Sequence, residues 1–205
     1  MAGRGDWVMP HNTKYAEGLI RQLHVLLVDD NPYMRTILQG LLIQIGVRHV
    51  TEAVDGISAL EKIREKAPDV ILLDWEMPLL NGAELVRIVR SPGVFPTPDI
   101  PIVMLTGHNE RWRILESIKI GVNEFLCKPV SAQALFDRLV SIVLKPRGSV
   151  HLGRYYGPVP RILASDRPAL ESPNARRSHG LARSYGAGTH SSPRARLEKK
   201  RPIAG

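Results

Sequence analysis

Short apolar runs alternate along the chain with longer stretches in which apolar residues recur at helical spacing. The run HVLLVDD at residues 24–30 ends in two acids. The stretch NPYMRTILQGLLIQIG at residues 31–46 then has apolar residues every three or four positions, with Asn31 and Pro32 placed as cap and first turn. This first pair predicts a strand followed by a helix.

Four more pairs of the same kind follow. The strand segments are HVTEAV (49–54), DVILLDW (69–75), IPIVMLT (100–106) and EFLCKP (124–129). The helix segments are DGISALEKIREKA (55–67), NGAELVRIVR (81–90), NERWRILESIKIG (109–121) and SAQALFDRLVSIVL (131–144). Crossover helices join parallel strands, and strands that are apolar throughout are covered on both faces. The pattern therefore predicts an α/β fold with an open, doubly wound sheet of five parallel strands.

The charge is unevenly distributed over the 205 residues, whose formal net charge is +8 at pH 7. From Lys145 onward there are 13 Lys and Arg against 3 Asp and Glu, a balance of +10, whereas residues 1–144 carry 15 against 17, a balance of −2. The segment 146–205 is rich in Pro, Gly, Ser and Arg and poor in apolar residues, so it is predicted to be a disordered basic tail. Residues 23–145 would form the domain, and residues 1–22 an extension that adds a short amphipathic turn or helix.

The single cysteine and the apolar content restrict the class of protein. Cys127 stands alone, which excludes an internal disulfide and a cysteine-based metal cluster. No segment approaches the run of about 18 apolar residues that a membrane span needs, and the N-terminus lacks the apolar core of a signal peptide. These features predict a cytoplasmic protein.

Polar side chains stand where the predicted strands end. The first strand ends in Asp29 and Asp30, the third in Asp74, the fourth in Thr106 and the fifth in Lys128. Ligands of such sheets bind outside the carboxyl ends of the strands. Crowded carboxylates need a cation, and oxygen ligands of this kind suit Mg²⁺. One carboxylate could then act as a nucleophile toward a phosphoryl group, with the metal and Lys128 offsetting charge and Thr106 donating a hydrogen bond.

Each of these residues also has a purely structural interpretation. Asp29 and Asp30 could cap the helix that follows them. Asp74 could pair with Lys128 in a salt bridge, although that would leave two further acids without a counter-charge, which favours the metal interpretation. Thr106 could simply belong to a turn.

The motifs that carry these residues resemble the receiver domain of two-component response regulators, of the single-domain, chemotaxis-regulator-like type. They are LLVDDNP, LLDWEMPLLNG, IVMLTGH and FLCKP, within residues 24–144. Asp30, Asp74, Thr106 and Lys128 are separated by 44, 32 and 22 residues, spacings close to those of the family. The resemblance implies a flavodoxin-like receiver fold.

The resemblance also implies how the acids work. Asp74 would take a phosphoryl group from a phosphohistidine on a sensor histidine kinase or phosphotransfer protein. Asp30 and Asp74 would bind Mg²⁺ directly, together with the backbone carbonyl of Glu76, and Asp29 would act mainly through water. Lys128 would pair with the phosphoryl oxygens.

The family further implies a switch. Thr106 would move toward the phosphate and let Phe125, three positions before the lysine, rotate inward; judged from one sequence, an aromatic residue there is otherwise a core residue. Residues 109–144 would then form the face that binds a downstream effector, and dimerisation through this face is left open. Such a protein catalyses only its own phosphorylation and dephosphorylation, so no enzyme with a turnover substrate is expected. The alternative is a DNA- or membrane-associating regulator acting through the basic tail, in which no DNA-binding domain is recognisable.

Overall fold

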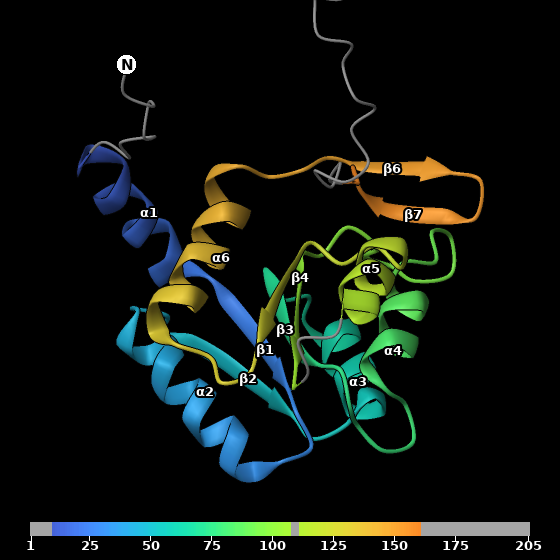
Figure 1. The fold of residues 1–205 in the computed structure, drawn as a ribbon, viewed down its shortest axis with the longest axis horizontal. Coiled ribbons are helices and arrows are strands. Elements are labelled where there is room, and N and C mark those ends of the chain that lie inside the picture. The colour runs from blue at the N-terminus through green and yellow to red at the C-terminus, as the bar shows by residue number, and fades with distance from the viewer. Residues whose placement is uncertain (1–9, 108–110, 161–205) are drawn as a thin grey trace, which may run out of the picture. The chain divides into compact units, whose positions relative to one another are not determined.

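The structure, a computed structural model, describes residues 10–107 and 111–160, and Figure 1 shows a sheet with helices on both faces. The sheet contains β1 (His24–Val28), β2 (His49–Ala53), β3 (Val70–Asp74), β4 (Ile102–Thr106) and β5 (Glu124–Cys127). The helices are α1 (Pro10–Gln22), α2 (Pro32–Gln44), α3 (Gly56–Glu65), α4 (Gly82–Val89), α5 (Arg111–Lys119) and α6 (Ala132–Leu144). None of the helices in these ranges is long and apolar enough to cross a membrane.

The strands are ordered β2-β1-β3-β4-β5, and all four neighbouring pairs are parallel. The predicted five-stranded, doubly wound parallel sheet is therefore confirmed. From β1 the chain crosses to β2 on one side and then returns to β3 on the other, so the strand order reverses between β1 and β3. This reversal opens a crevice at the carboxyl ends of the two strands.

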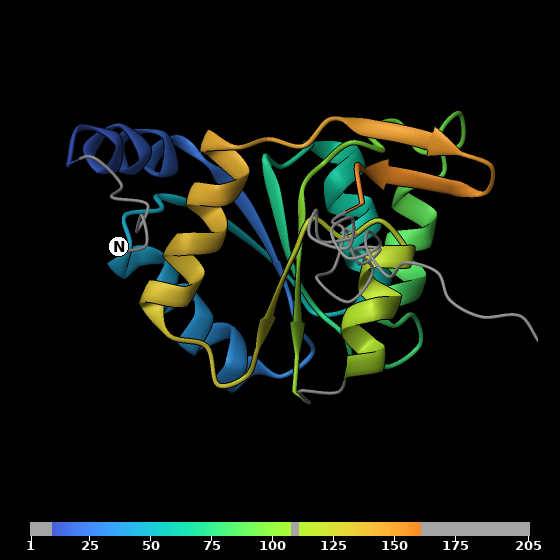
Figure 2. The same cartoon turned by 45° about the horizontal axis from the view of Figure 1, so that its top comes forward.

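Two hydrophobic cores, one on each face of the sheet, explain why the strands are apolar throughout. Side chains alternate along β1, so Leu26 and Val28 belong to one core while Val25 and Leu27 belong to the other. The first core packs beneath α3 and α4, and the second beneath α1, α2 and α6. Figure 2 shows these two groups of helices on opposite sides of the sheet, with α5 beside α4.

The N-terminal extension forms a helix that is part of the domain. Ala16 and Ile20 on α1 are fully buried, and Ile20 joins the core beneath α2 and α6. The predicted turn or helix before the first strand is thus a helix, and its apolar residues lie four positions apart as an amphipathic helix requires.

The chain does not lose its structure at residue 146. Two antiparallel strands, β6 (Ser149–Leu152) and β7 (Tyr155–Pro158), form a hairpin with Gly153 at φ 60 in the turn. The prediction of a disordered tail from residue 146 is therefore wrong for this segment. The hairpin is held by polar contacts, and its sequence lacks the alternation of apolar residues that predicts a strand. The Tyr156 hydroxyl donates to Asp99 at 2.8 Å, and Arg147 donates to the carbonyl of Val159 at 2.8 Å. Residues 161–205, the rest of the predicted tail, lie outside the described residues.

Candidate functional site

Three carboxylates meet where the strand order reverses. Asp29 and Asp30 follow β1 and Asp74 ends β3, and one oxygen from each lies within 4.8 Å of the others. Asp29 is fully buried and Asp74 is 6% exposed, whereas Asp30 is open to solvent. Three negative charges so close together repel one another unless a cation lies among them.

Lys128 supplies one positive charge to this cluster. Its Nζ lies 3.0 Å from Oδ2 of Asp29 and 2.9 Å from Oδ1 of Asp74. Burial raises the pKa of Asp74, and the hydrogen bond from Lys128 only partly offsets that effect. Burial alone would lower the pKa of Lys128, but its hydrogen bonds to Asp74 and Asp29 outweigh burial, so the pKa is raised. The lysine therefore stays charged and favours the ionised form of Asp74.

The loop after β3 fixes the carboxylate of Asp74. The backbone N–H of Trp75 donates to Oδ1 of Asp74 at 2.9 Å and also to the carbonyl of Leu105, which extends the ladder to β4. The start of α4 packs against the same backbone, since a Cβ at Gly82 would lie only 2.2 Å from the carbonyl oxygen of Asp74. Only glycine fits at this position without moving the acid.

The acid pair after β1 does not cap α2. Asn31 is the cap, because its side chain accepts from the backbone N–H groups of Tyr33 and Met34. Asp29 instead accepts from the backbone N–H of Asn31 at 2.9 Å through Oδ1, while its Oδ2 faces Lys128. Both oxygens of this buried acid are thus directed by the chain.

The remaining residues singled out from the sequence lie around the cluster. Thr106 ends β4 and is 3% exposed, and its carbonyl accepts the backbone N–H of Lys128 at 2.8 Å. Phe125 is half-buried on β5, beside Met104, and packs against the core beneath α3 and α4. Glu76 is exposed and forms an ion pair with Arg113 on α5.

The cluster opens into a hollow of about 600 Å³. The three acids, Lys128 and the segment 75–78 line this hollow. The sequence analysis did not single out two residues beside the hollow. Gly82, the residue after the cap of α4, makes a close backbone approach to Asp74, for which the NG pair was an available signal. Arg113 meets the loop after β3 only through the tertiary fold, so no local signal could have found it.

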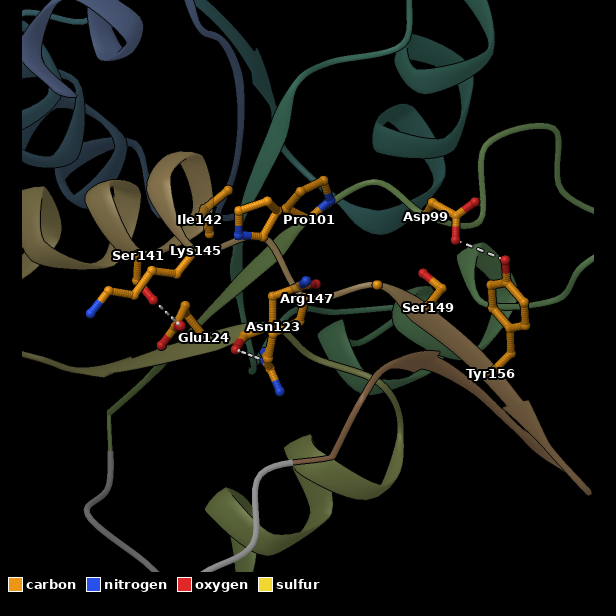
Figure 3. Close-up of a pocket in the computed structure, with 12 residues that line it drawn as sticks. Asp99, Pro101, Asn123, Glu124, Ser141, Ile142, Lys145, Arg147, Ser149 and Tyr156 are labelled. Carbon is orange, nitrogen blue, oxygen red and sulfur yellow. Dashed lines mark hydrogen bonds between the residues drawn. The ribbon is translucent and has the colours of Figure 1, made fainter. Parts of the chain in front are cut away.

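A second hollow, of about 420 Å³, lies at the opposite end of the sheet, where α6 meets the hairpin (Figure 3). Its acids already have partners: Glu124 accepts from Ser141 at 2.9 Å, and Asp99 accepts from Tyr156. Hydrogen bonding of this kind satisfies buried polar groups without a ligand. The crowded acids at the carboxyl ends of β1 and β3 are therefore the better candidate for chemistry.

An open doubly wound sheet that gathers three acids and a lysine at its switch point is suited to metal binding and phosphoryl transfer. The family model of the response regulator receiver domain matches residues 25–140. The chain belongs to the response regulator receiver family.

Relatives and solved structures agree with this assignment. Chemotaxis protein CheY1 of Helicobacter pylori is 37% identical over 118 residues, which are 57% of this chain and 94% of that protein. Chemotaxis protein CheY of Pseudomonas aeruginosa is 33% identical over 126 residues, 62% of this chain and 100% of that protein. The structure of Vibrio cholerae CheY4 is 31% identical with a TM-score of 0.54, and the match covers 59% of this chain and 98% of that one.

A further solved structure concerns the metal. The receiver domain of a sensor histidine kinase from Pseudomonas aeruginosa is 29% identical, with a TM-score of 0.51 over 58% of this chain and 98% of that one, and it has a magnesium ion coordinated in its active-site cleft. Receiver domains are phosphoacceptor signalling domains rather than enzymes with a turnover substrate, and those like CheY interact with histidine kinases and downstream effectors.

Proposed function

We propose that Asp74 is the phosphoacceptor of this receiver domain. The observation that carries the proposal is the place of this residue: Asp74 is 6% exposed at the end of β3 and lines the hollow, and its carboxylate lies 2.9 Å from Nζ of Lys128. An oxygen of Asp74 would attack the phosphorus of a phosphohistidine. The new O–P bond would form as the P–N bond breaks and its electron pair returns to the imidazole.

The neighbouring acids fit a Mg²⁺ ion. Asp29, Asp30 and Asp74 offer oxygens within 4.8 Å of one another, the donor type that Mg²⁺ prefers, and the backbone carbonyl of Glu76 would complete the protein's share. When bound, the ion supplies positive charge to the transferred oxygens. Lys128, already directed at Asp29 and Asp74, would move its hydrogen bond to a phosphoryl oxygen when Asp74 is modified.

The change at Asp74 would reach partners through β4 and β5. Thr106 would donate its hydroxyl to the phosphoryl group, and Phe125 would follow it inward, which biases the face formed by residues 109–144. Residues 109 and 110 of this face lie outside the described residues. Catalysis would be limited to the domain's own phosphorylation and dephosphorylation. A histidine kinase as donor accords with the predicted cytoplasmic location, which stays a prediction, and nothing favours the alternative function of the basic tail.

Intact-mass measurement tests the proposal directly. The full chain is incubated with Mg²⁺ and acetyl phosphate, beside an Asp74→Asn variant and an EDTA control. One added phosphoryl group in the wild type, absent from both controls, is the expected result. A group that persists in Asp74→Asn would assign the acceptor elsewhere, and a folded wild type that gains no mass from acetyl phosphate or from a phosphorylated histidine donor would refute the function.

A further inference from the structure

Arg113 lies on α5, yet it contacts both residues that follow Asp74. Its Nη2 donates to Oε1 of Glu76 at 2.6 Å. The centre of its guanidinium lies 5.8 Å from the ring centroid of Trp75 and 5.2 Å from that of Trp112. The two indole rings are themselves in edge-to-face contact, with centroids 6.2 Å apart and an angle of 88°. Aromatic faces at these distances attract a cation, so the guanidinium is fixed from three sides.

The two members of the ion pair differ in burial. The side chain of Arg113 is 12% exposed, whereas that of Glu76 is 63% exposed. Glu76 lines the acidic hollow, and Arg113 is not among the residues that line it. The arginine is thus the more buried partner, and it draws the exposed carboxylate toward α5 at the mouth of the hollow.

The charge of Glu76 matters because of where this mouth leads. Besides Glu76, the described residues that line the hollow include three carboxylates and one lysine. Focused charge of one sign in a cleft attracts oppositely charged ligands and repels those of the same sign. Without the positive charge of Arg113 beside it, Glu76 would therefore attract Mg²⁺ more strongly and repel an anionic phosphodonor.

We propose that Arg113 is a positioning residue for phosphoryl transfer: it neutralises Glu76 and holds that carboxylate away from the path of the phosphodonor. This role rests on the proposed function of Asp74, but it can be measured separately through metal binding. Trp75 and Trp112 serve the same role indirectly, since they hold the guanidinium in place.

The experiment compares Arg113→Met with a matched control. Methionine keeps an unbranched apolar stem against the indoles but removes the charge. Arg87→Met is the control, because Arg87 on α4 pairs with Glu116 on α5 at 2.8 Å, and neither residue lines the hollow. Glu76→Gln is made alone and combined with Arg113→Met. Two quantities are measured on the full chain: the rate of labelling by acetyl phosphate at saturating Mg²⁺, and the Mg²⁺ dissociation constant from calorimetry.

Arg113→Met is expected to slow labelling and to tighten Mg²⁺ binding, each by about three- to tenfold. Added Glu76→Gln should restore both quantities, Arg87→Met should change neither, and both effects should shrink in concentrated salt, where surface charges are screened. Glu76→Gln alone, which leaves α5 intact, should weaken Mg²⁺ binding. If Arg113→Met fails to fold, unchanged Mg²⁺ binding by Glu76→Gln would overturn the proposal, because the charge of Glu76 would then not act on the hollow.

The role of Arg113 would be overturned if Arg113→Met had the labelling rate and Mg²⁺ dissociation constant of the wild type. It would also be overturned if adding Glu76→Gln did not restore these two quantities. The failure of the proposed function looks different. In that case the wild type would not be labelled at all, while the Mg²⁺ titration of the four variants would still show whether Arg113 controls the charge of Glu76.

Discussion

Replacing Lys128 by methionine should destabilise the metal-free protein by about 2–3 kcal/mol at neutral pH. Each contact of its ammonium, at 3.0 and 2.9 Å from Asp29 and Asp74, corresponds to an attraction of about 6 kcal/mol at an effective dielectric constant of about 20. Desolvation of the lysine cancels most of this attraction. What the variant loses is the counter-charge of two buried acids, and a broken buried pair costs about 3–5 kcal/mol. We expect a cost at or just below the lower end of this range, because the Lys128 side chain is 17% exposed and the hollow is open to water.

The pH dependence separates charge from packing. The pKa of Asp74 is already raised above 3.8 by burial, and loss of Lys128 raises it further. A carboxyl group with a raised pKa binds its proton more tightly in the folded state, so its unfavourable effect is present above the folded pKa. That effect disappears as the pH falls through this value toward 3.8. The deficit of Lys128→Met should therefore narrow on acidification, and millimolar Mg²⁺ at neutral pH should narrow it too.

Urea unfolding, followed by circular dichroism at several pH values with EDTA or Mg²⁺, measures these differences. Lys119→Met, which removes an exposed charge from the last turn of α5, is the control and should change stability by less than about 0.5 kcal/mol. A deficit for Lys128→Met that stayed constant with pH and Mg²⁺ would mean that the lysine stabilises the fold through its apolar stem, and the electrostatic account would be wrong.

Three further predictions concern the scaffold. Gly157→Ala should lower the free energy of unfolding, measured by thermal unfolding, by about 2–4 kcal/mol, because φ of Gly157 is +154° and a Cβ there would lie 2.7 Å from the backbone of Gly121. Gly148→Ala is the control: a Cβ at Gly148 meets nothing within 4 Å, so this change should be near neutral. Tyr156→Phe removes the 2.8 Å hydrogen bond to Asp99 and should give faster amide exchange in the hairpin; unchanged exchange would show that this bond does not hold β7. Asp55→Ala should cost about 1 kcal/mol by loss of the cap of α3. Hydrogen bonds from the start of α3 lower the pKa of Asp55, so the stability that Asp55 contributes is present above pH 3.8 and is lost as the pH falls through the folded pKa. The free energies of unfolding of the wild type and Asp55→Ala, measured by urea titration, should therefore converge in acid.

The sequence predicts the sheet well because each strand has to be covered on two faces. Val70–Asp74 and Ile102–Thr106 are fully buried, so their apolar runs leave little choice of structure. The acids and the lysine follow from the same reasoning, since the carboxyl ends of parallel strands meet at one edge. Local signals therefore suffice wherever burial and topology together determine the position of a residue.

The features that the sequence did not predict depend on contacts between distant segments. Arg90 is 5% exposed and donates to the carbonyl of Gly121 at 2.8 Å and to the side chain of Asn123 at 2.9 Å. Burial lowers its pKa to about 10, the shift expected where desolvation outweighs nearby acids and phenols. Nothing in the local pattern distinguishes this arginine from the exposed Arg87 one turn earlier. The hairpin that packs beside it was missed for the same reason, because docking rather than alternation forms it.

The charge balance at the carboxyl edge of the sheet explains why the buried strand β3 ends in an acid, Asp74. Within residues 10–107 and 111–160, Asp29, Asp30 and Asp74 bring three negative charges to a place where Lys128 supplies one positive charge. A divalent cation would bring the cluster to neutrality, and a phosphoryl group on Asp74 would then add negative charge that Lys128 is placed to meet. Without the cation, that group would enter a cluster that is already negative, and its arrival would cost more. The deficit of positive charge therefore favours binding of a metal ion, and the bound ion would let the site accept and respond to phosphorylation.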